Sequence, residues 1–153
     1  MPLRILYATV SGNARLVAEA VALDADGLWT APIDVQDMHD ATSAVFEPGG
    51  TTLLLCIAST GSGNVPPDAV ALYQDLQDAP RYLGGLRYGL VSLGDSSYGS
   101  TFGGGAAQFD AALQDLGAER IGEPLQIDAM EHDEPEAVAL AWFRDWSESA
   151  PAV

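Results

Sequence analysis

Short polar side chains and glycines gather in three stretches of this chain, and each stretch directly follows an apolar run. The stretches are T-V-S-G-N-A at 9–14, S-T-G-S-G-N at 59–64 and G-D-S-S-Y-G at 94–99. Their hydroxyl groups supply hydrogen-bond donors without adding charge, and glycine lets the backbone come close to a ligand. Tyr98 adds an aromatic face on which a flat heteroaromatic ring could stack. The three stretches therefore indicate the binding of a small molecule that carries both polar and aromatic parts.

The first of these stretches is suited to a phosphate monoester. Thr9, Ser11 and Asn13 surround Gly12 at a predicted turn from a strand into a helix. The first N–H groups of a helix have no partner within the helix, and the helix dipole favours an anion beside them. Serine and asparagine are also common helix caps, so this turn by itself does not separate a phosphate site from an ordinary cap.

Two other phosphate-binding motifs are excluded by the sequence. A P-loop requires a lysine after its glycines, and this chain contains no lysine. The dinucleotide fingerprint G-x-G-x-x-G does not follow the first apolar run. Nucleoside triphosphate and NAD binding are therefore disfavoured.

The three stretches must be positioned by the elements around them, and the hydrophobic pattern predicts strands alternating with helices. The expected strands lie at about 3–8, 31–36, 51–58, 88–93 and 124–130, and the expected helices at about 13–24, 67–78, 105–116 and 135–146. This alternation predicts an α/β fold with a five-stranded parallel sheet and helices on both faces. The length of 153 residues and the absence of a linker or repeat favour a single domain over 1–153.

The composition narrows the classes of partner. The formal net charge is −16, which argues against nucleic acid and anionic membranes and favours cationic partners. No apolar run approaches the ~20 residues that a membrane-spanning helix needs, and no export signal is apparent, so a cytoplasmic protein is expected. The single cysteine, Cys56, lies in an apolar run and is expected to be buried and inert. His39 and His132 are isolated, so no metal site is expected.

The three stretches, taken in order, resemble the three flavin mononucleotide (FMN) loops of flavodoxins. The matching motifs are T-x-S-G-N, S-T-G-S-G and L-G-D-S-S-Y. The resemblance runs nearly end to end, and the region F-D-A-A-L-Q-D-L-G-A-E-R-I-G-E-P-L-Q-I-D is most similar to small MioC-type flavodoxins. Only a few residues separate Gly117 from the last expected strand, which matches the short-chain form. The resemblance implies a three-layer sandwich with strand order 2-1-3-4-5 and FMN at the carboxyl ends of the strands.

The resemblance also implies a set of FMN-binding residues. The phosphate would be held by the first loop and the isoalloxazine ring by the second and third, with Tyr98 stacked on the ring. The implied cofactor-binding residues are Thr9, Val10, Ser11, Gly12, Asn13, Ala14, Ser59, Thr60, Gly61, Ser62, Gly63, Leu93, Gly94, Asp95, Tyr98, Phe102 and Gly103. Two of them depart from the usual pattern, because many flavodoxins have threonine in place of Ala14 and an aromatic residue in place of Gly61. Each departure removes a contact, so weaker FMN retention is expected.

The implied function is electron transfer rather than stand-alone catalysis. The protein would carry single electrons between a flavoprotein reductase and a redox acceptor enzyme, both with basic docking faces, and would act as a monomer. Two alternatives remain open. Gly94-Asp95-Ser96 is also the core of a serine hydrolase signature, although here it follows the fourth strand rather than the first. An FMN-dependent NAD(P)H quinone reductase is the other, although the sequence suggests no nicotinamide site.

Overall fold

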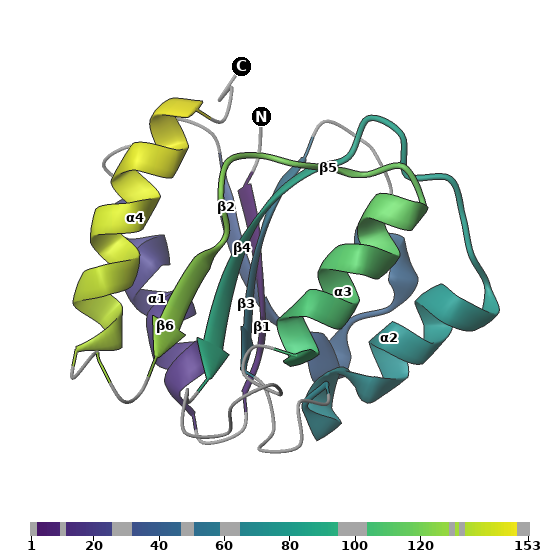
Figure 1. Cartoon of the computed structure of the whole chain (residues 1–153), viewed down its shortest axis with the longest axis horizontal. Helices are drawn as coiled ribbons and strands as arrows, with labels where there is room; N and C mark the ends of the chain where they lie inside the picture. Colours follow the sequence, from purple (N-terminus) through teal and green to yellow (C-terminus); the bar gives the residue numbers. More distant parts are fainter. Residues whose placement is uncertain are drawn as a thin grey trace.

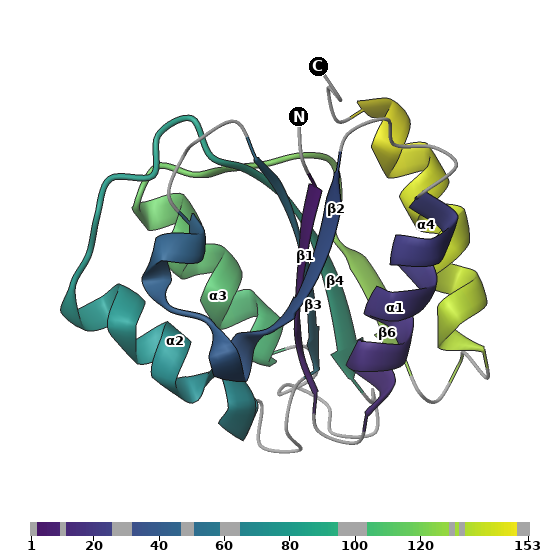
Figure 2. The same cartoon turned by 180° about the vertical axis from the view of Figure 1, so that it is seen from behind.

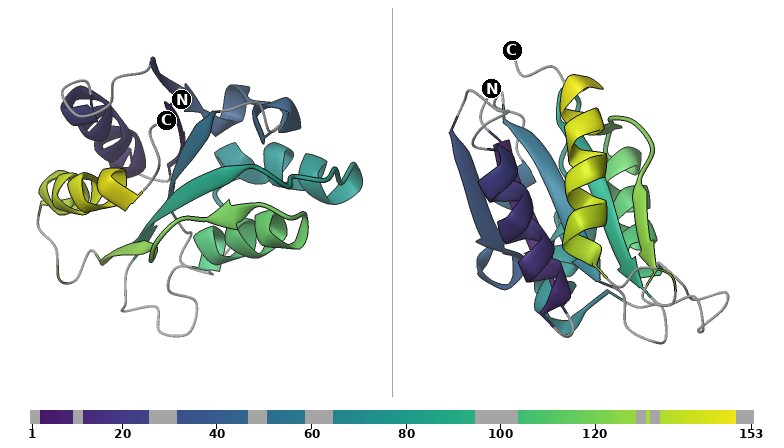
Figure 3. Two further views of the ribbon diagram at one scale, coloured as in Figure 1. Left: turned by 90° about the horizontal axis from the view of Figure 1, so that it is seen from above. Right: turned by 90° about the vertical axis from the view of Figure 1, so that its left-hand side faces the viewer.

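The computed structural model shows a central sheet between two pairs of helices (Figures 1 and 3). Helices α1 (Asn13–Ala25) and α4 (Pro135–Ser149) cover one face, and α2 (Pro67–Asp78) and α3 (Gly104–Asp115) cover the other. All four helices begin within one residue of the expected positions. The structure describes residues 3–9, 12–25, 32–46, 51–58, 65–94, 104–128, 131 and 134–149.

The sheet has the strand order that the resemblance implied. Strand β1 (Leu3–Ala8) lies between β2 (Ile33–Asp37) and β3 (Thr52–Ala58), and β4 (Arg87–Gly94) follows β3, which gives the order β2-β1-β3-β4-β5. Every pairing among the described strands is parallel. The α/β class, the strand order and the helices on both faces are therefore confirmed.

The fifth position of the sheet is occupied by two short segments instead of one continuous strand. Both β5 (Glu119–Arg120) and β6 (Leu125–Asp128) pair with β4, and the sequence pattern did not predict β5. The chain turns between them at Gly122, whose φ of +70° is a left-handed conformation that favours glycine. Indole N–H groups of α4 bind the carbonyls here: Trp146 donates to Ile121 (3.1 Å) and Trp142 to Glu123 (3.3 Å).

The core has two halves, one on each face of the sheet. Strand β3 is buried along its whole length, so its side chains alternate between the halves. Leu54 and Cys56 pack with α1 and α4, whereas Leu53 and Leu55 pack with α2 and α3. Burial raises the pKa of the Cys56 thiol to about 12, so this cysteine stays protonated and unreactive at neutral pH, as the sequence indicated.

The connection from β2 to β3 contains two short 3₁₀ segments, Met38–Asp40 and Ser43–Phe46. Met38 and Phe46 are both buried in the half of the core that includes α2. Figure 2 shows this connection beside α2. Its apolar side chains therefore complete the α2–α3 layer next to the edge strand β2.

Candidate functional site

Three of the parallel strands end side by side at one edge of the sheet, here called the carboxyl edge. Ala8 of β1 pairs with Ile57 of β3, and the next residue of β3, Ala58, pairs with Leu93 of β4. Neighbouring strands lie about 4.8 Å apart, so the ends of β1 and β4 are separated by only about 10 Å. The three polar stretches of the sequence leave the sheet at these three ends. The register therefore brings the three strand ends close enough together to serve one small ligand.

The described part of the turn between β1 and α1 brings Thr9 and Gly12 together. The Gly12 N–H donates a hydrogen bond to Thr9 Oγ1 at 2.7 Å, which folds the turn back toward the strand. Gly12 has a φ of +95°, in the left-handed region, and no atom of the described residues lies within 4 Å of the place where a side chain would begin. The described residues therefore leave the space beside the turn open, and the Thr9 hydroxyl keeps its own hydrogen for a further acceptor.

The first turn of α1 contributes backbone donors to the same place. The first hydrogen bond of the helix runs from the Leu16 N–H to the Gly12 carbonyl at 3.1 Å, so the N–H groups of residues 13–15 precede the helical ladder. The Asn13 side chain is exposed, whereas Ala14 is completely buried in the core beneath α1. Ala14 has no side-chain donor, so at this position only the backbone N–H is available to a ligand.

The rest of the expected cofactor-binding set is only partly described. Leu93 is 7% exposed and packs in the α1–α4 half of the core, and Gly94 ends β4 opposite Asp128 of β6. The side chain of Asp128 is buried at the same edge. The expected residues outside the described part of the chain are Val10, Ser11, Ser59, Thr60, Gly61, Ser62, Gly63, Asp95, Tyr98, Phe102 and Gly103.

One charged residue near the turn was missed by the sequence analysis. Arg15, in the first turn of α1, donates from Nε to Glu19 Oε1 at 2.8 Å, and this hydrogen bond raises the pKa of the guanidinium. The nearby Tyr7 has its pKa raised by burial and by the Asp37 carboxylate. The only sequence signal for Arg15 was its place three residues after Gly12.

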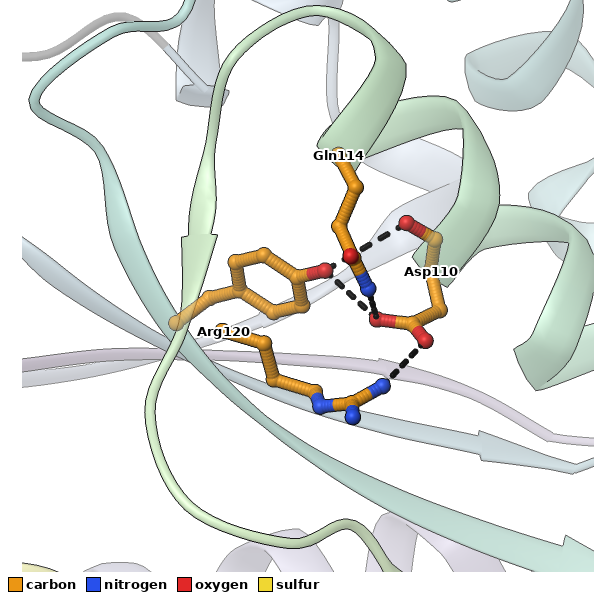
Figure 4. Close-up of polar contacts among 4 residues, drawn as sticks. Asp110, Gln114 and Arg120 are labelled. Atoms are coloured by element: carbon orange, nitrogen blue, oxygen red, sulfur yellow. Dashed lines mark hydrogen bonds and ion pairs between the residues drawn. The ribbon is translucent and has the colours of Figure 1, made fainter.

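A second polar cluster, which the sequence did not indicate, lies at the opposite end of β4 (Figure 4). Asp110 of α3 accepts hydrogen bonds from Tyr88 Oη (2.5 Å), from Gln114 Nε2 (3.0 Å) and from Arg120 Nη1. Tyr88 is the second residue of β4 and pairs with Arg120 of β5, so the cluster lies where β4 begins. It joins α3 to two strands and is separate from the turn after β1.

The described segments lack two further kinds of feature. Among these residues, no group of three or more histidine, cysteine, aspartate or glutamate side chains is placed to hold a metal ion. None of the helices in the same segments combines the length and the apolar character that a membrane crossing demands.

Comparison with known proteins agrees with this arrangement. The flavodoxin family model matches residues 5–142. Flavodoxin YqcA of Pectobacterium carotovorum is 39% identical over 149 residues, which cover 97% of this chain and 96% of that protein. The protein MioC of Escherichia coli K12 is 30% identical and covers 93% of each chain. A solved structure of a point mutant of flavodoxin from Pseudomonas aeruginosa superimposes with a TM-score of 0.80 at 28% identity, over 97% of this chain and 98% of that one.

The family match covers nearly the whole chain, and the match to a solved flavodoxin extends over the same fold. The motifs quoted from the sequence follow the strands at the carboxyl edge, where a ligand of an open α/β sheet binds. The chain is therefore a member of the flavodoxin family.

Proposed function

We propose that the protein is an FMN-binding electron carrier that passes single electrons between a flavoprotein reductase and a redox enzyme. The observation that supports this most directly is the turn between β1 and α1. It combines the hydroxyl hydrogen of Thr9, open space beside Gly12 and the first N–H groups of α1. These are neutral donors at the positive end of a helix dipole, and they fit a phosphate dianion.

The residues of the three loops would divide the cofactor between them. Thr9, Ser11, Gly12 and Asn13 would bind the phosphate. The 59–63 and 93–103 stretches would enclose the ring, with Tyr98 against one face. Bound FMN supplies the redox chemistry, and the protein orients it and sets the polarity around it. The last residue of each of the three strands is alanine or glycine, which leaves room for a ring above the sheet edge.

The phosphate assignment predicts that the apo-protein binds FMN much more tightly than riboflavin. The two ligands differ only by the phosphate, whose charge-assisted hydrogen bonds are about twice as strong as neutral ones. Titration of apo-protein into each flavin, followed by the quenching of flavin fluorescence, measures both dissociation constants. A dissociation constant for FMN equal to that for riboflavin would contradict the assignment, and no binding of either flavin would contradict the proposed function as a whole.

The two alternatives receive no support from the comparisons. A serine hydrolase would require Ser96 to act as a nucleophile, and the similar proteins described above are named flavodoxins or MioC. An assay with p-nitrophenyl esters distinguishes the two hypotheses, since we expect no hydrolysis by the wild type. Ester hydrolysis that disappeared in Ser96→Ala would favour the hydrolase instead. NAD(P)H oxidation by the purified FMN-loaded protein without a reductase would favour the quinone reductase.

A further inference from the structure

The permanently charged cations of this chain are distributed unevenly along the sheet. The chain has six arginines and no lysine, and five of the six lie where the strands begin. Arg4 and Arg87 are in the first two residues of β1 and β4, Arg81 precedes β4 and Arg120 is in β5. Arg144 contacts a carboxylate near the end of α1.

Arg15 is the sixth arginine, and it alone belongs to the carboxyl edge. It follows Gly12 by three residues, and residues three apart on a helix are neighbours on its surface. The Arg15 guanidinium is bonded to Glu19, one turn further along the helix, and its side chain is 62% exposed, so it is free to reorient toward Gly12. The titratable groups that face it are Glu19 on its own helix, Tyr7 of β1 and Asp37 at the end of β2.

The contacts of Arg15 within the protein do not explain why a cation stands at this position. The first turn of a helix is its positive end, where a cation is unfavourable and an anion favourable. The ion pair with Glu19 is exposed. A pair in which the basic residue comes four positions before the acidic one stabilises a helix less than a pair in the reverse order. A phosphate beside the turn would supply the missing anion. It would also be repelled by the rest of a chain whose net charge is −16.

We propose that Arg15 is a specificity-determining residue for the phosphate group, and that it strengthens the binding of FMN relative to riboflavin by offsetting the repulsion from the acidic surface. This inference rests on the proposed function, because it concerns the same site. The guanidinium acts through its charge across a distance shorter than the Debye length of about 8–10 Å. Loss of this charge should weaken the binding of a phosphorylated flavin and leave the binding of an uncharged one unchanged.

Arg144 provides a matched control for the test. Its side chain is 61% exposed, against 62% for Arg15, and it is also paired with a single carboxylate. Arg15→Ala and Arg144→Ala therefore change the net charge of the protein equally. The first removes a charge beside the turn, and the second removes a charge near the opposite end of the α1–α4 layer. Arg15→Lys restores the charge without the planar guanidinium, and Glu19→Gln removes the competing carboxylate.

The experiment is a fluorescence titration of FMN and of riboflavin with each apo-protein at about 20 mM and about 500 mM NaCl, which bracket strong and weak screening. We expect Arg15→Ala to weaken FMN binding about fivefold at low salt, from the Coulomb interaction of one charge with a phosphate dianion. The affinity of Arg15→Ala for riboflavin should equal that of the wild type. Arg144→Ala should bind FMN as tightly as the wild type, and Arg15→Lys should recover most of the FMN affinity that Arg15→Ala loses. Glu19→Gln should bind FMN more tightly than the wild type. At high salt the difference should shrink to less than about twofold.

The possible failures of the proposal are distinct from those of the proposed function. Equal FMN affinity in the wild type and Arg15→Ala would overturn the role of Arg15 alone. A parallel loss of affinity for FMN and riboflavin would also overturn it, since that would indicate a structural effect on the whole site. A wild type that binds no FMN would overturn the proposed function and this inference together.

Discussion

At the scale of single residues, the site depends on Gly12 more than on any other described position. Its φ of +95° is a backbone conformation that costs an L-amino acid about 1–2 kcal/mol, and no atom of the described residues lies within 4 Å of the place where a side chain would begin. The Thr9 hydroxyl accepts the Gly12 N–H and so depends on the same conformation. A side chain at position 12 would therefore disturb both the shape of the turn and the room for the ligand.

Gly12→Ala should lower the free energy of unfolding by about 1–2 kcal/mol and weaken FMN binding about tenfold, since overpacking costs about 1–3 kcal/mol. Gly122→Ala is the control, because Gly122 also has a positive φ (+70°) and the nearest atom to an added side chain is at 3.7 Å, in Trp146. We expect a similar loss of stability in urea unfolding but unchanged FMN affinity. Equal effects of both substitutions on FMN binding would show that stability, and not the turn, controls affinity.

At the scale of elements, the cluster around Asp110 fixes α3 against the sheet. The Asp110 carboxylate accepts hydrogen bonds from Tyr88 of β4, from Arg120 of β5 and from Gln114, one turn along the same helix. Buried ion pairs contribute little net stability, but the loss of one partner leaves the other with its desolvation cost. The cluster therefore holds α3 in one position along its axis, and α3 directly follows the 94–103 stretch in the chain.

Tyr88→Phe should reduce the free energy of unfolding by about 1–2 kcal/mol at neutral pH, because a hydrogen bond to a largely buried carboxylate is lost. Burial, followed by the hydrogen bond to Asp110, raises the pKa of Tyr88 above its ordinary value of about 10. A raised pKa means that the unfolded chain loses this proton first, so the stability from Tyr88 is complete below about pH 10 and declines as the pH rises further.

Urea unfolding of the wild type and Tyr88→Phe between about pH 7 and about pH 11.5 measures this effect. The difference in stability between the two proteins should be constant up to about pH 10 and should then decrease. Tyr82→Phe serves as a control at neutral pH, because Tyr82 is 83% exposed and its substitution should leave stability unchanged. A difference that grew at higher pH would contradict the raised pKa of Tyr88.

At the scale of the whole molecule, the net charge of −16 dominates encounters with other proteins. The carboxyl edge carries Asp68 in the first turn of α2 and Glu136 in the first turn of α4, and of the six arginines only Arg15 lies there. Carboxylates near a helix N-terminus are favoured by the dipole, so these acids suit their own helices as well. A partner with a basic face would be attracted to the edge at which, in the proposed function, the electron enters and leaves.

We therefore expect the rate of electron transfer from a basic-faced flavoprotein reductase to fall by about tenfold or more between about 20 and about 300 mM NaCl, since electrostatic steering is screened by salt. Stopped-flow absorbance of the FMN-loaded protein measures this rate. Dithionite is the control, because it is a small anion that the same surface repels, and its rate should increase with salt. A reductase rate that did not vary with salt would remove electrostatic docking from the proposal.

The sequence by itself determined the order and nature of the four helices and of the longer strands, because strand and helix periodicity are local properties. Strands 3–8 and 51–58 and helix 67–78 were predicted within one residue. The motif letters were sufficient to indicate the family and the three loops. The weak second strand begins two residues later and ends one residue later than expected, since β2 is an edge strand whose side chains are only partly buried. Edge strands have the faintest pattern because one side of the strand has no neighbour.

Only the tertiary structure decided which side chains meet across the fold. The short strand β5 contains two charged residues, Glu119 and Arg120, and it is a strand because it pairs with the start of β4. The contacts of Asp110 with Tyr88, and of Trp146 with the Ile121 carbonyl, join residues 22 and 25 apart. The isolation of Arg15 at the carboxyl edge likewise emerges only once the other five arginines have been placed. Local propensity cannot encode these relations, because each depends on how helices and strands pack in space.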